Sequence, residues 1–318
     1  MPSTAHALDS LQIVGDGRAQ DDPAVRSKQW YNDRVTTSPD DGRYVDLHLH
    51  TTWSDGRWEP RRVVDEAAAR GLTAIAVTDH DVVDGLAEAR QAADEHGIAF
   101  LAGVELTADW DGRTVHVLGY GIDPSDPTLT SALDRGRTLM AAHVEEVLAA
   151  LEQAGTPLSP DDLARYRVRY ASGAALVLAM VQHGILRKAS NGGALLRLAS
   201  REPRAYTAAE AIAVTHAAGG IAALAHPAKI VRDRPHLVPD ELRPLAEAGL
   251  DAVEVWQIVH GDRERAHYAE VAESLGLTVV GGSDCHGPRK SAGPRIGSQR
   301  IPYAVYAHLI DVLAGRQP

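Results

Sequence analysis

The sequence predicts an α/β protein whose strands form a parallel barrel or a wound sheet. From residue 45 onward, short apolar runs typical of strands alternate with segments whose apolar residues recur at helical spacing. Histidines and acidic residues stand directly after several of the apolar runs. Chemistry-bearing residues at successive strand ends are typical of α/β enzymes, in which those ends share one mouth.

Composition limits the class of protein. The chain has 318 residues, of which 44% are hydrophobic, enough for a sizeable core. Its formal net charge of −11 disfavours a protein that tracks nucleic-acid backbone, so we expect no stable nucleic-acid partner. Cys285 is the only cysteine, which excludes an intrachain disulfide and a cysteine metal cluster. No apolar run approaches the roughly 20 residues of a membrane helix, and no signal pattern opens the chain. We therefore predict a cytoplasmic protein with no membrane partner.

The strand–helix alternation occupies two stretches, 43–123 and 207–318, which we predict to form one barrel domain. Residues 1–42 read as an irregular leader without chemistry. Strands are expected from residue 45 and at about 74–77, 98–106, 114–120, 220–224, 251–256 and 277–280. Helices are expected at about 60–70, 83–96, 207–218, 239–248, 261–275 and 303–314.

Between these stretches, residues 124–206 read as helices without convincing strands, at about 129–153, 160–166, 172–183 and 193–200. This pattern predicts an inserted helical subdomain. The insertion interrupts the chain directly after His116, whose strand end is expected at the mouth. We therefore expect the insertion to cover the active site and set substrate choice without contributing a metal ligand.

Imidazole and carboxylate side chains gather at the expected strand ends. His48 and His50 are two residues apart on a strand, so they point the same way, although an isolated His-x-His equally fits a strand end hydrogen-bonded to neighbours. The strand ends supply nine such residues: His48, His50, Asp55, His80, Glu105, His116, His226, Asp284 and His286. Without thiolate, this set suits zinc, manganese or iron, and it is too large for one ion. The sequence predicts a metal cluster.

Six motifs, in this order, resemble those of the PHP (polymerase and histidinol phosphatase) family. They are Asp46-Leu-His-Leu-His50, Ser54-Asp-Gly56, Thr78-Asp-His80, Gly103-Val-Glu105, Ala225-His-Pro227 and Gly282-Ser-Asp-Cys-His-Gly287, and the match covers about 44–124 and 207–302. The resemblance implies a distorted (β/α)7 barrel with up to three metal ions. It is closest to the stand-alone phosphoesterases, similar to AMP and nucleoside-bisphosphate phosphatases, which carry a helical insertion at the corresponding place.

The resemblance also implies a ligand set for each ion. The first ion is held by His48, His50, Glu105 and Asp284; the second by Glu105 as a bridge, His116 and His226; and the third by Asp55, His80 and His286. Of these residues, we assign Glu105, Asp284 and His226 to catalysis. Outside the motif context, His116 and His226 would each read as structural histidines.

Three divalent ions would make the pocket cationic inside an acidic protein. They bring six positive charges, and the three ligand carboxylates return three negative ones, so the site attracts a phosphate dianion. Two ions can share a water, lower its pKa and present hydroxide for in-line attack at phosphorus, while another stabilises the leaving oxygen. The ligand set accepts manganese, zinc and iron.

Four basic residues are candidates for binding the substrate. Arg137, Lys229, Arg289 and Lys290 could bind outer phosphate oxygens, and each reads equally well as a solvated surface charge. His260 follows a strand end and resembles a histidine near the pocket of relatives.

One segment departs from the family pattern. Nucleotide phosphatases and exonuclease-like relatives carry Arg-Pro-His in the insertion, where this chain has Arg169-Tyr-Ala-Ser-Gly173. Arg169 reads as a displaced survivor of that motif. We therefore expect a changed substrate grip, with weak hydrolysis of ordinary nucleoside monophosphates.

These observations predict a metal-dependent phosphoesterase that converts a small phosphorylated metabolite or nucleotide to alcohol plus phosphate. A 3′–5′ exonuclease or oligonucleotide phosphodiesterase would use the same metals. An amidohydrolase is a further alternative, although no candidate for its bridging lysine is found. A non-catalytic, metal-stabilised module of the kind attached to polymerases is disfavoured, because no ligand position is lost and no polymerase-sized remainder is present.

Overall fold

The computed structural model describes residues 41–164, 173–188, 190–201, 203–230, 236–288 and 295–316. The expected irregular leader falls almost entirely outside these ranges. So do Arg169, Arg289 and Lys290, three of the candidate phosphate-binding residues.

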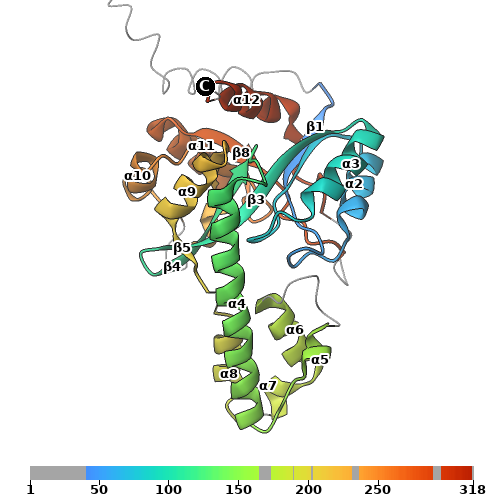
Figure 1. Ribbon diagram of the computed structural model, residues 1–318. Coiled ribbons are helices and arrows are strands. Elements are labelled where there is room, and N and C mark those ends of the chain that lie inside the picture. Colours follow the sequence, from blue (N-terminus) through green and yellow to red (C-terminus); the bar gives the residue numbers. More distant parts are fainter. Residues whose placement is uncertain are drawn as a thin grey trace, which may run out of the picture.

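A nine-stranded sheet, curled into a nearly closed barrel, forms the centre of the molecule (Figure 1). The strand order is β8-β7-β6-β4-β3-β2-β1-β9, with β5 paired to β3. The strands are β1 (Tyr44–Leu49), β2 (Leu72–Val77), β3 (Ala99–Trp110), β4 (Arg113–Tyr120), β5 (Tyr206–Thr207), β6 (Ile221–Leu224), β7 (Ala252–Trp256), β8 (Thr278–Gly281) and β9 (Ile301–Pro302). Apart from the two-residue β5 and β9, seven strands form the barrel, and the predicted distorted (β/α)7 fold is confirmed.

The strand β4 runs antiparallel to both of its neighbours, β3 and β6, whereas sequence analysis expected parallel strands. The cause is a two-residue turn at Asp111 and Gly112, both with positive φ (51° and 76°), which folds β3 and β4 into a hairpin. His116 on β4 is paired with Thr107 on β3. It therefore reaches the mouth from the first half of its strand.

The barrel closes where β1 meets the segment that follows β8. The backbone N–H of His50 donates to the carbonyl of Cys285 at 3.1 Å. Gly282 is required here, because a Cβ at this position would lie 2.1 Å from the Cβ of His48. The buried carboxylate of Asp46 accepts the backbone N–H groups of Ser283 and Gly297, both at 2.8 Å. These contacts bring the Asp284 loop beside the β1 histidines.

Helices cover the outside of the barrel. They are α2 (Pro60–Ala69), α3 (Leu86–His96), α9 (Ala208–Ala217), α10 (Pro239–Glu247), α11 (Asp262–Leu275) and α12 (Tyr303–Ala314). Their apolar faces pack on the strands in one continuous core, which includes Leu47, Ile75, Leu106 and Ile212. Among the described residues, no helix is both long and apolar enough to cross a membrane.

The helical segment consists of α4 (Pro127–Gln153), α5 (Pro160–Ala164), α6 (Gly173–Gln182), α7 (Ile185–Lys188) and α8 (Gly192–Ala199). It does not begin directly after His116, because β4 continues to Tyr120. The 27 residues of α4, about 40 Å of helix, then run alongside the barrel to the other helices of the segment (Figure 1). The chain returns through β5, which pairs with the far end of β3 at Ala108 and Asp109.

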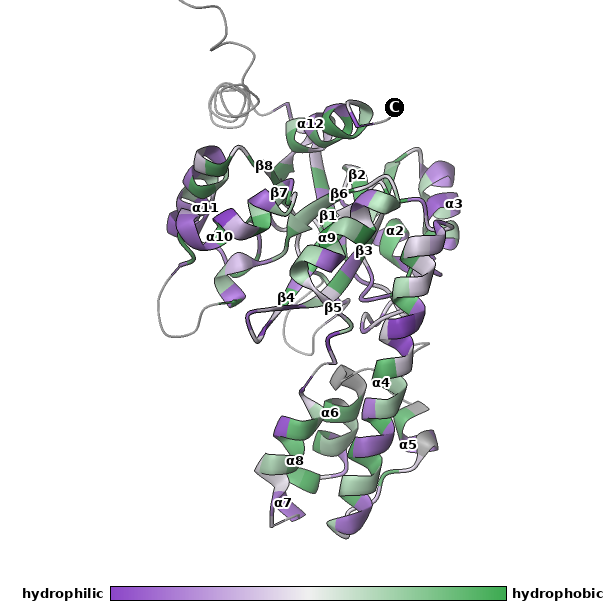
Figure 2. Cartoon of the chain, turned by 60° about the vertical axis from the view of Figure 1, so that its left-hand side comes forward, coloured by the Kyte–Doolittle hydropathy of each residue, from purple (hydrophilic) through white to green (hydrophobic). Residues whose placement is uncertain are grey.

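The segment has an apolar core of its own, separate from that of the barrel. Figure 2 shows hydrophobic residues on the facing sides of its helices. This cluster includes Val147 and Leu151 of α4, Leu176 and Met180 of α6, and Leu195 of α8. The α5–α8 helices therefore pack on the far half of α4 rather than on the sheet.

Candidate metal centre

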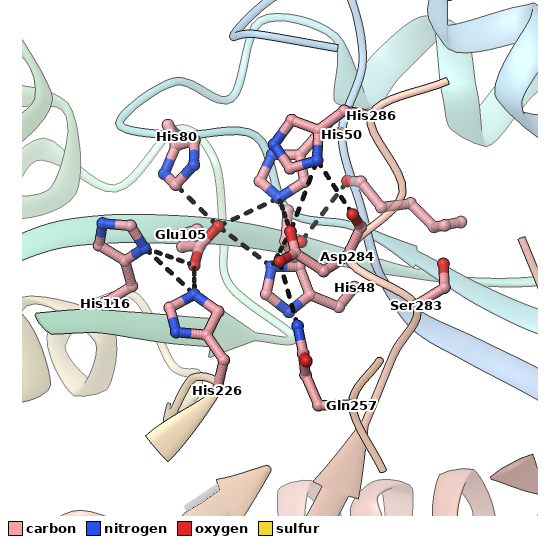
Figure 3. A network of polar contacts seen from close by, with 12 residues as sticks. His48, His50, His80, Glu105, His116, His226, Gln257, Ser283, Asp284 and His286 are labelled. Carbon is pink, nitrogen blue, oxygen red and sulfur yellow. Dashed lines mark hydrogen bonds and ion pairs between the residues drawn. The ribbon is translucent and has the colours of Figure 1, made fainter. Parts of the chain in front are cut away.

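All nine predicted ligands converge at one end of the barrel, although up to 238 residues separate them in sequence. Figure 3 labels all of them except Asp55. They come from β1, β3 and β4, and from the loops that follow β1, β2, β6 and β8. Three groups of side chains each bring their ligand atoms within 4.8 Å of one another: His50, Asp55, His80 and His286; His48, His50 and Asp284; and His80, Glu105 and His116. Two of these groups share His50, and two share His80. The cluster is therefore continuous.

Glu105 lies at the centre of the cluster and is fully buried. Its Oε2 is 3.1 Å from Nε2 of both His48 and His50, and 3.4 Å from Nδ1 of His80. Its Oε1 lies 2.9 Å from Nδ1 of His116 and 3.1 Å from Nε2 of His226. Each oxygen thus faces a different set of imidazoles, as the role of a bridging carboxylate requires.

The carboxylates of Asp284 and Asp55 complete the cluster on the side of His50. Oδ1 of Asp284 is 3.3 Å from Nε2 of His50 and 3.6 Å from Nε2 of His48. Oδ1 of Asp55 is 3.0 Å from Nε2 of His286 and 3.8 Å from Nδ1 of His50. His50 lies between these two carboxylates, so it could serve either of two ions.

The nitrogen and oxygen atoms of the cluster are better arranged to coordinate metal ions than to hydrogen-bond with one another. Within the described part of the chain, Nε2 of His50, Nδ1 of His80 and Oδ1 of Asp55 are buried without an aligned hydrogen bond. Buried polar atoms are normally hydrogen-bonded. These three atoms have carboxylates or imidazoles nearby, but none of those groups is oriented to form a hydrogen bond with them. Nitrogen and oxygen donors with no thiolate suit zinc, manganese or iron.

The buried charges of the cluster shift the pKa values of its members. Burial by itself would raise the pKa of Glu105, but the charges of His80, His48 and His116 outweigh it and hold that pKa well below the usual range. Burial would lower the pKa of His50, but the nearby carboxylates of Asp284 and Glu105 outweigh it and raise that pKa to about 10. The carboxylates therefore stay ionised, and bound cations would neutralise them.

Two of the predicted ligands lie on strained backbone. His226 has φ 29° and Asp284 has φ 53°, in the left-handed region that non-glycine residues seldom adopt. Asp81, the residue after His80, has φ 51°. Such strain persists only where the surroundings fix it, and it is concentrated at functional sites.

Asp79 anchors the loop that carries Asp55. Its buried carboxylate accepts the backbone N–H of Thr51 at 2.7 Å and the hydroxyls of Thr51 and Ser54, each at 2.6 Å. These three bonds fix the turn between His50 and Asp55. The side chains of His50 and Asp55 are thereby held in place relative to each other.

Sequence analysis assigned no role to Glu254, which the structure places against the cluster. It lies within β7, fully buried, and its Oε1 is 3.0 Å from Nδ1 of His48. A carboxylate inside the otherwise apolar run Ala252–Trp256 was the signal that could have found it, because an ionised group is rarely buried without a partner.

The predicted substrate-binding residues lie in different surroundings. Nζ of Lys229 is 2.5 Å from Oδ2 of Asp284, at the edge of the cluster. Arg137 is on α4 and forms ion pairs with Asp84 and Asp134, in a cleft of about 550 Å³ beside α3.

His260 lies on the outer side of β7 rather than among the ligands. Its Nδ1 contacts the carbonyl oxygen of Val255 at 2.8 Å, and its ring stacks on Tyr268 of α11. Neither contact directs it toward the ligand cluster. Arg169 lies outside the described residues.

Comparison with known proteins agrees with this geometry. The model of the PHP domain family matches residues 46–192. A 3′,5′-nucleoside bisphosphate phosphatase of Chromobacterium violaceum is 34% identical over 257 residues, which cover 77% of this chain and 87% of that protein. The chain belongs to the PHP family. As a PHP protein it is a metal-dependent hydrolase of phosphoric ester bonds.

Two further PHP relatives extend the comparison. A 5′-3′ exoribonuclease of Haemophilus influenzae is 37% identical over 189 residues, which cover 57% of this chain and 68% of that one. A Bifidobacterium adolescentis protein assigned as a metal-dependent phosphoesterase superposes with a TM-score of 0.72 at 27% identity, covering 88% of this chain and 98% of that one. The resemblance to stand-alone phosphoesterases is confirmed.

Proposed function

We propose that the chain is a phosphomonoesterase for small phosphorylated metabolites, with nucleoside 3′,5′-bisphosphates as the first substrate class to test. The observation that carries the proposal is the position of Glu105, whose two oxygens face separate sets of imidazoles. The Chromobacterium relative, by its name, acts on nucleoside bisphosphates and is similar over most of its length.

In this proposal the site holds about three ions of manganese, zinc or iron, as the nine ligands suggest. When bound, such ions activate water for attack at phosphorus and neutralise charge on the phosphate oxygens. Glu105 would hold two ions at a fixed separation, and Asp284 and His226 would complete their ligand sets. Asp55, His80 and His286 would hold the third, so all nine ligand assignments enter the proposal unchanged.

Lys229 is the best placed of the proposed substrate-binding residues. Its ammonium group contacts the outer oxygen of Asp284, and its side chain remains 41% exposed. A phosphate entering the cluster would find this cation at the rim and could compete with Asp284 for it. Arg137, Arg169 and His260 are the other proposed substrate-binding residues. The ion pairs of Arg137 and the contacts of His260 with Val255 and Tyr268 lie outside the ligand cluster.

We further propose that residues 124–206 act as a cover that sets substrate choice, with 43–123 and 207–318 as the catalytic barrel. The helical segment rejoins the barrel at β5, beside the end of β3 that extends past Glu105. The nine proposed ligands all lie outside 124–206. We also propose a cytoplasmic location, from the composition alone.

A second candidate is an exoribonuclease acting on short oligonucleotides. The relative from Haemophilus influenzae favours it, although its name gives 5′-3′ polarity, opposite to the direction suggested from the sequence. Both activities would use the same ligand cluster, so the ligands do not separate them. The two activities differ in the leaving group and in the length of the substrate.

A substrate screen with manganese-reconstituted protein tests the proposal. The panel contains nucleoside 3′,5′-bisphosphates, nucleoside monophosphates, sugar phosphates, 5′-phosphorylated oligoribonucleotides and amides, with Glu105→Gln as the inactive control. We expect phosphate release from bisphosphates, with monophosphates and oligonucleotides at least about 10-fold slower. Shortening of oligonucleotides faster than any phosphate release from small substrates would replace this proposal with the exoribonuclease.

A further inference from the structure

Glu254 is the one carboxylate of the described chain that contacts a predicted ligand ring on the side away from the cluster. Its Oε1 lies 3.0 Å from Nδ1 of His48, while Nε2 of His48 is directed at Oε2 of Glu105, 3.1 Å away. The ring of His48 is therefore held between two carboxylates, one inside the cluster and one behind it. Figure 3 shows the inner side of this arrangement.

The other oxygen of Glu254 holds a second ligand. Oε2 accepts the backbone N–H of His226 at 2.6 Å, and His226 is the ligand with φ 29°. Within the residues that the structure describes, no lysine or arginine is paired with Glu254. Its buried charge is thus directed at the ring of one ligand and the strained backbone of another.

From these contacts we infer that Glu254 is a positioning residue for the metal centre. It fixes the Nδ1–H tautomer of His48, so that Nε2 presents its lone pair to the ion, and it holds His226 in its strained conformation. His48 and His226 are assigned to different ions, which Glu105 would bridge. One buried carboxylate on β7 therefore sets the relative positions of two ligand sets.

The chemistry of a Glu254→Gln substitution shows why the carboxylate is needed. A carboxylate can accept hydrogen bonds at both oxygens, whereas an amide has one oxygen and one NH₂ group. If the amide oxygen accepts from His226, the NH₂ group faces Nδ1 of His48 and favours the wrong tautomer, with the proton on Nε2. If the amide is flipped, its NH₂ group faces the backbone N–H of His226, so that two donors point at each other and no hydrogen bond forms. Either arrangement disturbs one ligand.

The same strand provides a matched control at its other end. Asp251 precedes β7 and also binds an imidazole and a backbone N–H: its Oδ2 lies 2.8 Å from Nε2 of His216 and 2.9 Å from the backbone nitrogen of Ala222. Neither partner belongs to the ligand cluster. Asp251→Asn therefore disturbs an equivalent pair of contacts, together with the ion pair between Asp251 and Arg316, without touching a predicted ligand.

The inference rests on the metal site of the proposed function, and its test does not use turnover. Manganese and zinc affinities of the full-length wild type, Glu254→Gln and Asp251→Asn are measured by competition with a chromogenic chelator, and thermal unfolding without metal checks folding. Glu254→Gln is expected to weaken metal binding roughly 10- to 100-fold, whereas Asp251→Asn keeps the wild-type affinity. Glu254→Asp, which keeps the charge, should recover part of the loss.

Wild-type affinity in a folded Glu254→Gln protein would overturn the inference, and so would equal losses in the two variants. If Glu254→Gln does not fold, long-range ¹H–¹⁵N spectra of the zinc-loaded wild type test the inference instead, because they show which ring nitrogen of His48 carries the proton. The proton of His48 must then be on Nδ1, and a proton on Nε2 contradicts the inference. If the substrate screen shows no phosphate release from bisphosphates but the metal affinities change as expected, the proposed substrate is rejected and the role of Glu254 is still supported.

Discussion

The barrel mouth and the helical segment are stabilised by different kinds of interaction. At the mouth, buried imidazoles and carboxylates such as His50 and Glu105 lie against each other and perturb each other's pKa values. In the helical segment, a separate cluster of aliphatic side chains, among them Leu176 and Met180, holds α6 and its neighbours against α4. The mouth is therefore sensitive to charge and to metal, whereas the segment should respond mainly to packing.

The largest effect is expected from Glu105→Gln, which removes the charge shared by both halves of the cluster. Turnover should fall roughly 10³-fold, because the substitution weakens charge stabilisation at the reacting phosphate. Asp55→Asn should cost less, since Asp55 is assigned only to the third ion. Rates are compared at matched metal content, and Glu105→Gln activity equal to wild type would refute the bridging role.

A pair of leucine substitutions tests whether the two regions are independent. Leu106→Ala in β3 and Leu176→Ala in α6 both remove a buried side chain, at an expected cost of about 2–5 kcal/mol in the region concerned. Leu106 follows Glu105, so its loss should also lower metal content. Leu176→Ala should leave metal content unchanged, as measured by elemental analysis of the folded variants. Loss of metal in Leu176→Ala would mean that the segment supports the cluster directly.

The pH dependence of the metal-stripped protein sharpens the contrast further. The pKa of His50 is raised from its ordinary value of 6.5 to about 10 by nearby carboxylates. A raised histidine pKa stabilises the fold below pH 6.5, and this contribution is lost as the pH rises through 10. The urea midpoint should therefore fall between pH 6.5 and 10, by an amount worth a few kcal/mol. His50→Gln should flatten this dependence, and a midpoint that rises with pH would contradict the account.

The smallest effect is expected from Lys229→Ala. It removes the cation at the rim that contacts Oδ2 of Asp284, while Gln257 still donates to that oxygen at 3.1 Å. KM for an anionic substrate should rise roughly 10-fold or less, with metal content unchanged. Arg137→Ala is the comparison, and it should change KM less because Arg137 is paired with Asp84 and Asp134. Loss of metal in Lys229→Ala would assign the lysine to the ligand shell instead.

Residues that follow strands in short motifs were predictable from the sequence. The pairs His48 and His50, and Asp284 and His286, are close in sequence, and the barrel places the ends of their strands at one mouth. The strand–helix rhythm also predicted the positions of most elements, because buried runs and amphipathic stretches carry their own periodicity.

The direction of β4 and the role of Glu254 were harder to predict. An apolar strand reads the same in either direction, and only the Asp111-Gly112 pair indicated a hairpin. Glu254 and His48 are 206 residues apart in sequence, so no local sequence pattern could predict their contact. The pairing of Lys229 with Asp284 likewise depends on two loops from different strands.

Metal stoichiometry tests the central claim most directly, because the account treats the whole mouth as one continuous ligand cluster. Purified protein is stripped of metal, reconstituted separately with manganese, zinc and iron at neutral pH, freed of excess ion and analysed for bound metal per chain. We expect about three ions per chain with at least one of these metals, since fewer would leave buried carboxylate charge uncompensated. A stoichiometry that stays below two for all three metals would contradict the trinuclear site.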